Sequence, residues 1–234
     1  APTEKLIDAL QLMMWPSPGL SGMAVYDAFI ADDGPVSFEM GVIGTDPLFV
    51  LPEMKELVRR GPSALAALIA HLDDKRPTLL VFGRGPTAVP FMWQVFSAEY
   101  QARSGDFARE VDEVPFSGDY TVRVGDVCFV VVGQIVNRRF TAVRYQPTAG
   151  LVVNSPIEAP ELIDWIKRDW AELSAAAHEA QLLIDIRRSE RETLQHSALR
   201  RLRFYYPGAY RALSGEDRAK RDAFEAAEFD RLGR

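Results

Sequence analysis

Apolar residues in the first third of the chain recur at helical spacing, and this pattern predicts three helices there. Residues 3–14 place four apolar side chains on one helical face, and a threonine stands at the N-cap position. Pro52 is suited to open a second helix, which Gly61 closes. Pro62 opens a third, which stops before Pro77. The two helices joined by Gly-Pro are expected to form a helical pair.

The apolar centre of the sequence, residues 120–155, changes to shorter periods and predicts a small β element. The alternation at 121–124 favours a strand. The stretch Asp126–Val136 is open between helix and strand, because its valines favour a strand while its length favours a helix. We interpret it as a helix. Residues 140–145 and 151–153 are expected to be strands.

Other stretches carry weaker patterns. Residues 20–46 are expected to form loops with one short hairpin, and 78–119 to be irregular apart from a short helix within 91–103. The C-terminal third is expected to be helical, with helix starts at Pro160, Ser189 and Ser214. The sequence therefore predicts an α+β fold, predominantly α-helical, with a small β element around residues 120–155. Because no linker divides it, residues 1–234 are expected to form a single compact domain.

Composition and charge restrict the class of protein. Apolar residues make up 47% and charged residues 26%, which is typical of a globular chain, and no apolar run is long enough to span a membrane. A soluble protein without membrane insertion is expected. Residues 1–120 carry 17 acidic and 9 basic side chains, whereas 121–234 carry 16 and 18. Nucleic acid is therefore an unlikely partner, and the acidic half suits a basic protein.

Catalytic and metal-binding motifs are absent from the sequence. The single cysteine, Cys128, stands in the most apolar run and is expected to be a buried thiol. The histidines His71, His178 and His196 show no metal-ligand spacing. No cofactor, metal or catalytic residue is predicted. A hydrolase or transferase site around Cys128 and a distant histidine is kept as the alternative.

Two polar clusters are candidate binding sites. Arginines interleaved with aromatic residues at 200–211 could contact single-stranded nucleic acid, or could pair with carboxylates while the aromatic side chains pack inward. The acidic composition favours the second reading. Beside the apolar centre lie polar side chains that either satisfy loop carbonyls or line a recognition pocket. These candidate binding residues are Gln134, Asn137, Arg138, Arg144, Tyr145, Gln146 and Asn154.

Short runs spread over roughly residues 60–210 carry a family resemblance. VGDVCFVVVGQIVNR, then AVRYQP and NSP, and later ALRRLRFYYP resemble uncharacterised bacterial proteins that include exported members. The run AHLDDKRPT is similar to helix-turn pieces of HEAT-like repeats. The first resemblance implies a bacterial origin and no particular chemistry. A chain that begins Ala-Pro-Thr is also compatible with a removed signal peptide, a removed initiator methionine or a trimmed terminus.

The leading functional hypothesis is a non-enzymatic bacterial protein that binds another protein, for example an immunity-type or envelope-associated protein. A periplasmic or exported location is expected, with the cytoplasm as the alternative. Enzymatic activity is not favoured, because no spacing-specific catalytic motif is present. The oligomeric state is left open.

Overall fold

The computed structural model describes residues 1–20, 29–32, 49–85, 88–89, 91–145, 150–188 and 191–232, of which 109–112 and 231–232 as backbone alone. The hairpin expected within 20–46 falls largely outside the described residues. The chain divides into two compact units, Ala1–Leu173 and Ser174–Arg234. The single-domain prediction stays a prediction.

The first unit combines helices with two sheets. Its helical elements are α1 (Thr3–Ala9), η1 (Leu10–Leu12), α2 (Pro52–Arg60), η2 (Gly61–Ala64), α3 (Leu65–Ala70), α4 (Val124–Val136) and α5 (Glu161–Trp170). Its strands are β1 (Pro77–Phe82), β2 (Trp93–Gln101), β3 (Phe107–Pro115), β4 (Tyr120–Arg123), β5 (Val143–Tyr145) and β6 (Gly150–Val153). A four-stranded sheet has the order β3-β2-β6-β5, and β1 pairs with β4 in a separate two-stranded sheet. Strands β2 and β6 run parallel, and the other pairs are antiparallel.

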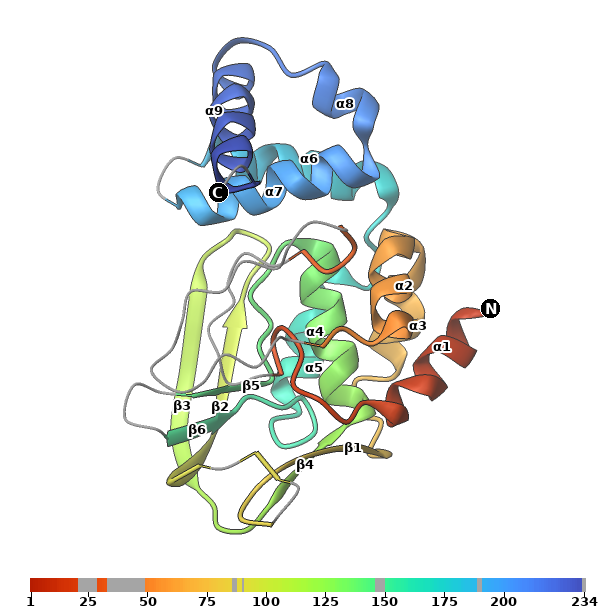
Figure 1. Cartoon of the computed structure of the whole chain (residues 1–234), viewed down its shortest axis with the longest axis vertical. Coiled ribbons are helices and arrows are strands. Elements are labelled where there is room, and N and C mark those ends of the chain that lie inside the picture. Colours follow the sequence, from red (N-terminus) through yellow and green to blue (C-terminus); the bar gives the residue numbers. More distant parts are fainter. Residues whose placement is uncertain are drawn as a thin grey trace. The chain divides into compact units, whose positions relative to one another are not determined.

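Helix α4 is the centre of this unit, with α1, α2 and α3 packed against it (Figure 1). All of its side chains except that of Gln134 are buried, as expected for a helix that is apolar all round. Its first turn is capped by Asp126, whose Oδ2 accepts from the backbone N of Arg123 at 2.8 Å. Asn137 ends the helix in the left-handed region, at φ 58°. The prediction of a helix over Asp126–Val136 is confirmed.

Two glycines of α4 let other segments of the protein approach the helix closely. A Cβ at Gly125 would lie 2.4 Å from the carbonyl oxygen of Leu72, and one at Gly133 would lie 2.6 Å from Cβ of Phe140. The α3–β1 turn and the segment after α4 therefore pack directly on the backbone of the helix. Gly133, which weakens the helix signal in the sequence, is required by this packing.

The predicted fold class is wrong in its proportions. The protein is a mixed α+β protein, and the β structure is not confined to residues 120–155. Strands β1, β2 and β3 lie within 78–119 or at its edge, where the sequence predicts irregular structure, and β2 occupies the stretch expected to be a short helix. Strand β2 lies between β3 and β6 and buries both apolar and polar side chains, so it lacks the two-residue alternation of a half-exposed strand. The strands predicted after α4 are confirmed as β5 and β6.

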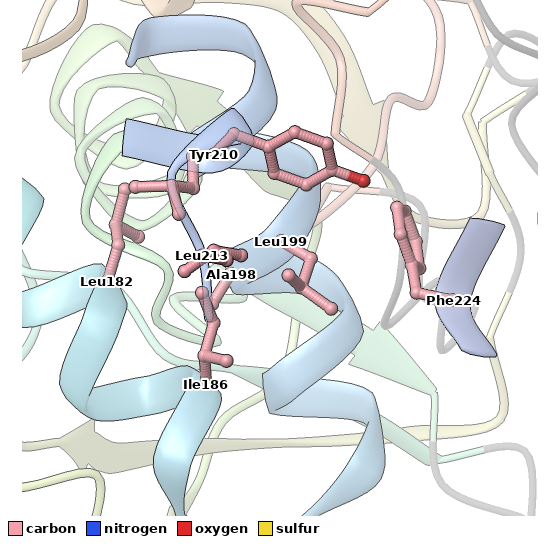
Figure 2. Packing of buried hydrophobic residues seen from close by; sticks show 8 residues of the cluster. Leu182, Ile186, Ala198, Leu199, Tyr210, Leu213 and Phe224 are labelled. Atoms are coloured by element: carbon pink, nitrogen blue, oxygen red, sulfur yellow. The ribbon is translucent and has the colours of Figure 1, made fainter. Parts of the chain in front are cut away.

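The second unit is helical, as the sequence predicts. It consists of α6 (Ala175–Arg187), α7 (Glu192–Tyr205), α8 (Pro207–Arg211) and α9 (Gly215–Leu232). Ser174 caps α6 by accepting from the backbone N of Ala177 at 3.2 Å. Figure 2 shows side chains from all four helices and the α8–α9 connection meeting in one apolar core, formed by Leu182, Ile186, Ala198, Leu199, Leu202, Tyr210, Leu213 and Phe224. Among the helices that the structure describes, none has the length and apolar character needed to cross a membrane.

Candidate functional site

The polar residues predicted as a binding site bond largely to the protein itself. Arg144 on β5 reaches across the sheet to Glu99 on β2: its Nε donates to Glu99 Oε2 at 3.2 Å and its Nη2 donates to Oε1. The side chains are 22% and 10% exposed, so the pair is largely removed from water. Because β6 lies between β2 and β5, this two-point contact links strands that do not pair with each other.

Asn154 continues the sheet immediately after β6. Its Oδ1 accepts from the backbone N of Glu99 at 2.7 Å, and its Nδ2 donates to the backbone O of Glu99 at 2.9 Å. Nδ2 also lies 3.3 Å from the carbonyl oxygen of Thr141. The side-chain amide therefore makes the two hydrogen bonds to β2 that a strand residue would otherwise make. Asn154 thus extends the pairing of β6 with β2 by one residue.

Arg138 gathers backbone carbonyl groups at the C-terminal end of α4. Its Nε donates to Ala102 O at 2.8 Å, its Nη2 to Arg103 O at 2.6 Å and its Nη1 to Asn137 O at 2.8 Å. The guanidinium also lies 5.3 Å from the ring centre of Trp170 on α5. One buried side chain thus holds together the β2–β3 turn, the end of α4 and the end of α5.

The remaining predicted residues are more dispersed. Gln134 Oε1 accepts from the backbone N of Ile30 at 3.2 Å, and Asn137 is the cap of α4. Tyr145 is half-buried on β5, and burial raises the pKa of its hydroxyl to about 12. Gln146 lies outside the described residues. The structure therefore brings Arg144 and Asn154 together around Glu99, and places Arg138 and Asn137 at the end of α4. A role for this set in ligand binding stays a prediction.

A buried carboxylate that the sequence marks only as a first-turn residue organises another part of this unit. Asp126 Oδ2 accepts from the Tyr120 hydroxyl at 2.8 Å, in addition to the Arg123 backbone N, and Oδ1 accepts from Ser155 Oγ. Burial nevertheless raises the pKa of this carboxyl above its usual range. These hydrogen bonds hold β4, α4 and the β6–α5 connection together. Because none of the three side chains is exposed, the cluster offers no access to a substrate.

Cys128 and two of the three histidines lie in different units. Cys128 is fully buried in α4, and burial raises the pKa of its thiol, which opposes a nucleophilic role. His178 and His196 belong to the second unit. Nδ1 of His178 lies 3.0 Å from the Tyr206 hydroxyl, which itself donates to Ala175 O at 2.9 Å. The described residues include no group of three or more His, Cys, Asp or Glu side chains arranged to hold a metal ion.

The arginines interleaved with aromatic residues are engaged within the second unit. Arg200 Nε and Arg203 Nη2 donate to the two carboxylate oxygens of Glu228, at 3.0 and 2.9 Å. Both guanidinium groups also lie within 6 Å of the ring centre of Phe224, at 5.8 and 5.5 Å. Arg200 and Arg203 thus pair with a carboxylate, as the second reading expects, but the aromatic residues at 200–211 do not all pack inward: Tyr210 is 6% exposed and Phe204 is 38% exposed.

Sequence reasoning missed a group of exposed apolar side chains in the first unit. They are Leu12, Met14, Trp15, Phe49 and Leu79, each between 44% and 62% exposed. We call this group the N-terminal apolar surface. Its segments are neighbours, because η1 packs against β1 and the backbone N of Phe49 donates to Pro16 O at 3.2 Å. Figure 1 shows the end of α1, from which η1 continues, close to β1. The signal in the sequence was the run of large apolar residues at 12–15, interpreted only as the end of a helix.

Comparison with known proteins adds no assignment: no family model, curated protein or solved structure gives a significant match to the chain.

Proposed function

We propose that the protein is a non-enzymatic protein-binding protein and that a partner covers the N-terminal apolar surface. The observation that carries the proposal is the exposure of five large apolar side chains on neighbouring segments of one unit. Clustered apolar side chains of this size are costly to leave in water, and such patches often mark interaction sites. A tryptophan among them supports this role, because tryptophan is enriched among residues that dominate binding energy.

Charge supports a basic partner. The first unit carries 23 acidic and 15 basic side chains, whereas the second carries 10 and 12. A net charge of −8 on the first unit would accelerate association with a cationic protein and would make the rate of association fall as salt is raised. The family resemblance supports a bacterial origin and a periplasmic or exported location, and an immunity-type or envelope-associated protein is an example of a non-enzymatic protein that would bind such a partner.

The test is an affinity capture from extracts of the source organism at low and high salt, with bound proteins identified by mass spectrometry. The native protein is compared with a Trp15→Ala/Leu79→Ala double variant and with Phe229→Ala, a matched control whose apolar side chain is 78% exposed in the second unit. A stoichiometric partner that the control retains and the double variant loses would support the proposal. Equal capture by all three proteins would move the binding site away from this surface.

A further inference from the structure

His71 lies between two carboxylates from different parts of the first unit. The residue follows α3, and its Nδ1 lies 3.1 Å from Asp74 Oδ2 in the turn before β1. Its Nε2 lies 2.9 Å from Glu4 Oε2 on α1. A carboxylate oxygen only accepts hydrogen bonds, so both contacts are satisfied only when both ring nitrogens carry a proton. The geometry therefore fits the imidazolium form.

The two contacts differ in how easily they can be released. Asp74 is 10% exposed and also accepts from Nε and Nη2 of Arg76, at 3.0 and 2.6 Å. These bonds hold the pKa of Asp74 at about 2 against the effect of burial, so it remains an anion that needs donors. Glu4 is 63% exposed, and its carboxylate can turn to water. A neutral His71 would therefore keep its proton on Nδ1, facing Asp74, and lose its bond to Glu4.

Other charged groups near His71 are engaged in contacts of their own. Nη1 of Arg76 donates to Asp8 on α1 at 2.7 Å, which gives α1 a second ionic contact. From α4, the backbone N of Gly125 donates to Asp74 O at 3.0 Å, and the ionisable Asp126 that follows is engaged with Tyr120 and Ser155. The Arg76–Asp8 contact does not involve His71, so loss of the Glu4 contact loosens α1 without releasing it.

We propose that His71 is a pH-dependent clamp on α1, fastening the helix through Glu4 when protonated and loosening it when neutral. Helix α1 continues into η1, which ends at Leu12, and Met14 and Trp15 come next, so the clamp also sets how firmly that part of the N-terminal apolar surface is held. This effect on the N-terminal apolar surface matters only if the proposed function holds, whereas the clamp itself does not depend on that function. Burial lowers the pKa of His71, but the bonds to Asp74 and Glu4 outweigh it and raise the pKa above the usual 6.5. The clamp is therefore complete below pH 6.5 and is lost as the pH rises through the folded-state value.

The test is amide hydrogen exchange of Ile7 to Leu10 between pH 5.5 and 8.5, corrected for the intrinsic exchange rate and measured without any partner. For a partly exposed ion pair, the opening equilibrium of α1 in the native protein should rise about two- to fivefold over this range. His71→Gln should abolish the rise. His196→Gln should retain it, because that histidine lies in the second unit with its Nε2 3.8 Å from Glu192.

Glu4→Ala provides an independent check at an exposed position, where substitution leaves the core intact. Alanine offers His71 no acceptor, so the opening of α1 should not depend on pH in this variant. Opening that is independent of pH in the native protein, or a rise that persists in both His71→Gln and Glu4→Ala, would overturn the clamp. Because no partner is present, either result leaves the proposed function to be judged by the capture experiment alone.

Discussion

Replacing Arg144 with methionine would leave a buried carboxylate without its ionic partner, and this loss should be measurable in stability. The change keeps most of the side-chain volume on β5 and removes both contacts to Glu99. Glu99 is 10% exposed, so water would reach its carboxylate only partly. Removing the ionic partner of a charge in such a position is destabilising even when the original pair contributed little net stability.

The expected magnitude follows from the burial of the two partners. Breaking a fully buried ion pair typically costs about 3–5 kcal/mol. Because Arg144 is 22% exposed, water already screens its end of the pair, and we expect Arg144→Met to lower the free energy of unfolding by about 2–4 kcal/mol. The double variant Arg144→Met/Glu99→Met removes both charges and should recover about 2 kcal/mol relative to the sum of the single variants.

The assay is urea unfolding of native protein, both single variants and the double variant, followed by circular dichroism. The same comparison separates the two readings of Arg144 that the sequence leaves open. If its main task were to grip a ligand, Arg144→Met would change stability by less than 1 kcal/mol and the four proteins would be additive, within the spread of surface substitutions. That result would refute the structural reasoning.

Three further outcomes are expected. Cys128 in native protein should react with a thiol reagent only after denaturant is added, since it is fully buried and the pKa of its thiol is raised; rapid labelling would contradict burial. Phe224→Ala should destabilise the second unit by about 3–4 kcal/mol, because the side chain is 1% exposed in its core, whereas the matched change Phe229→Ala should cost less than 1 kcal/mol in the same thermal melt. A fragment of residues 174–234 should be helical by circular dichroism, since this unit has its own apolar core; an unstructured spectrum would instead support the single-domain prediction.

The helices were predictable from the sequence because their signals are local. A proline or a capping side chain marks several helix starts, and α4 is recognised by an apolar run too long for an ordinary strand. Strand β2 was missed because its burial depends on β3 and β6, which the local sequence does not contain. Its buried Glu99 and Gln101 also give the segment the mixed polar and apolar pattern of an amphipathic helix.

For the candidate site, too, the sequence predicts the residues but not their distant partners. The sequence identifies Arg138, Arg144 and Asn154 as polar residues that need partners, because unpaired polar groups beside an apolar centre are costly. Their partners lie 36, 45 and 55 residues away along the chain, so only the folded structure reveals them. The N-terminal apolar surface could not be foreseen for the opposite reason. A run of apolar residues looks the same in sequence whether the fold buries it or leaves it in water.

The Asp126 cluster has a consequence for the order in which the first unit folds. Two of its three donors, Tyr120 and the Arg123 backbone, lie six and three residues away, so they can engage the carboxylate as soon as the first turn of α4 forms. Ser155 lies 29 residues further along, and its hydroxyl arrives only when β6 has paired. Mutations at Tyr120 should therefore slow folding, whereas Ser155→Ala should mainly accelerate unfolding. The hydrogen bonds of a single carboxylate would then form at two stages of folding, the first when α4 begins and the last when the chain has closed around it.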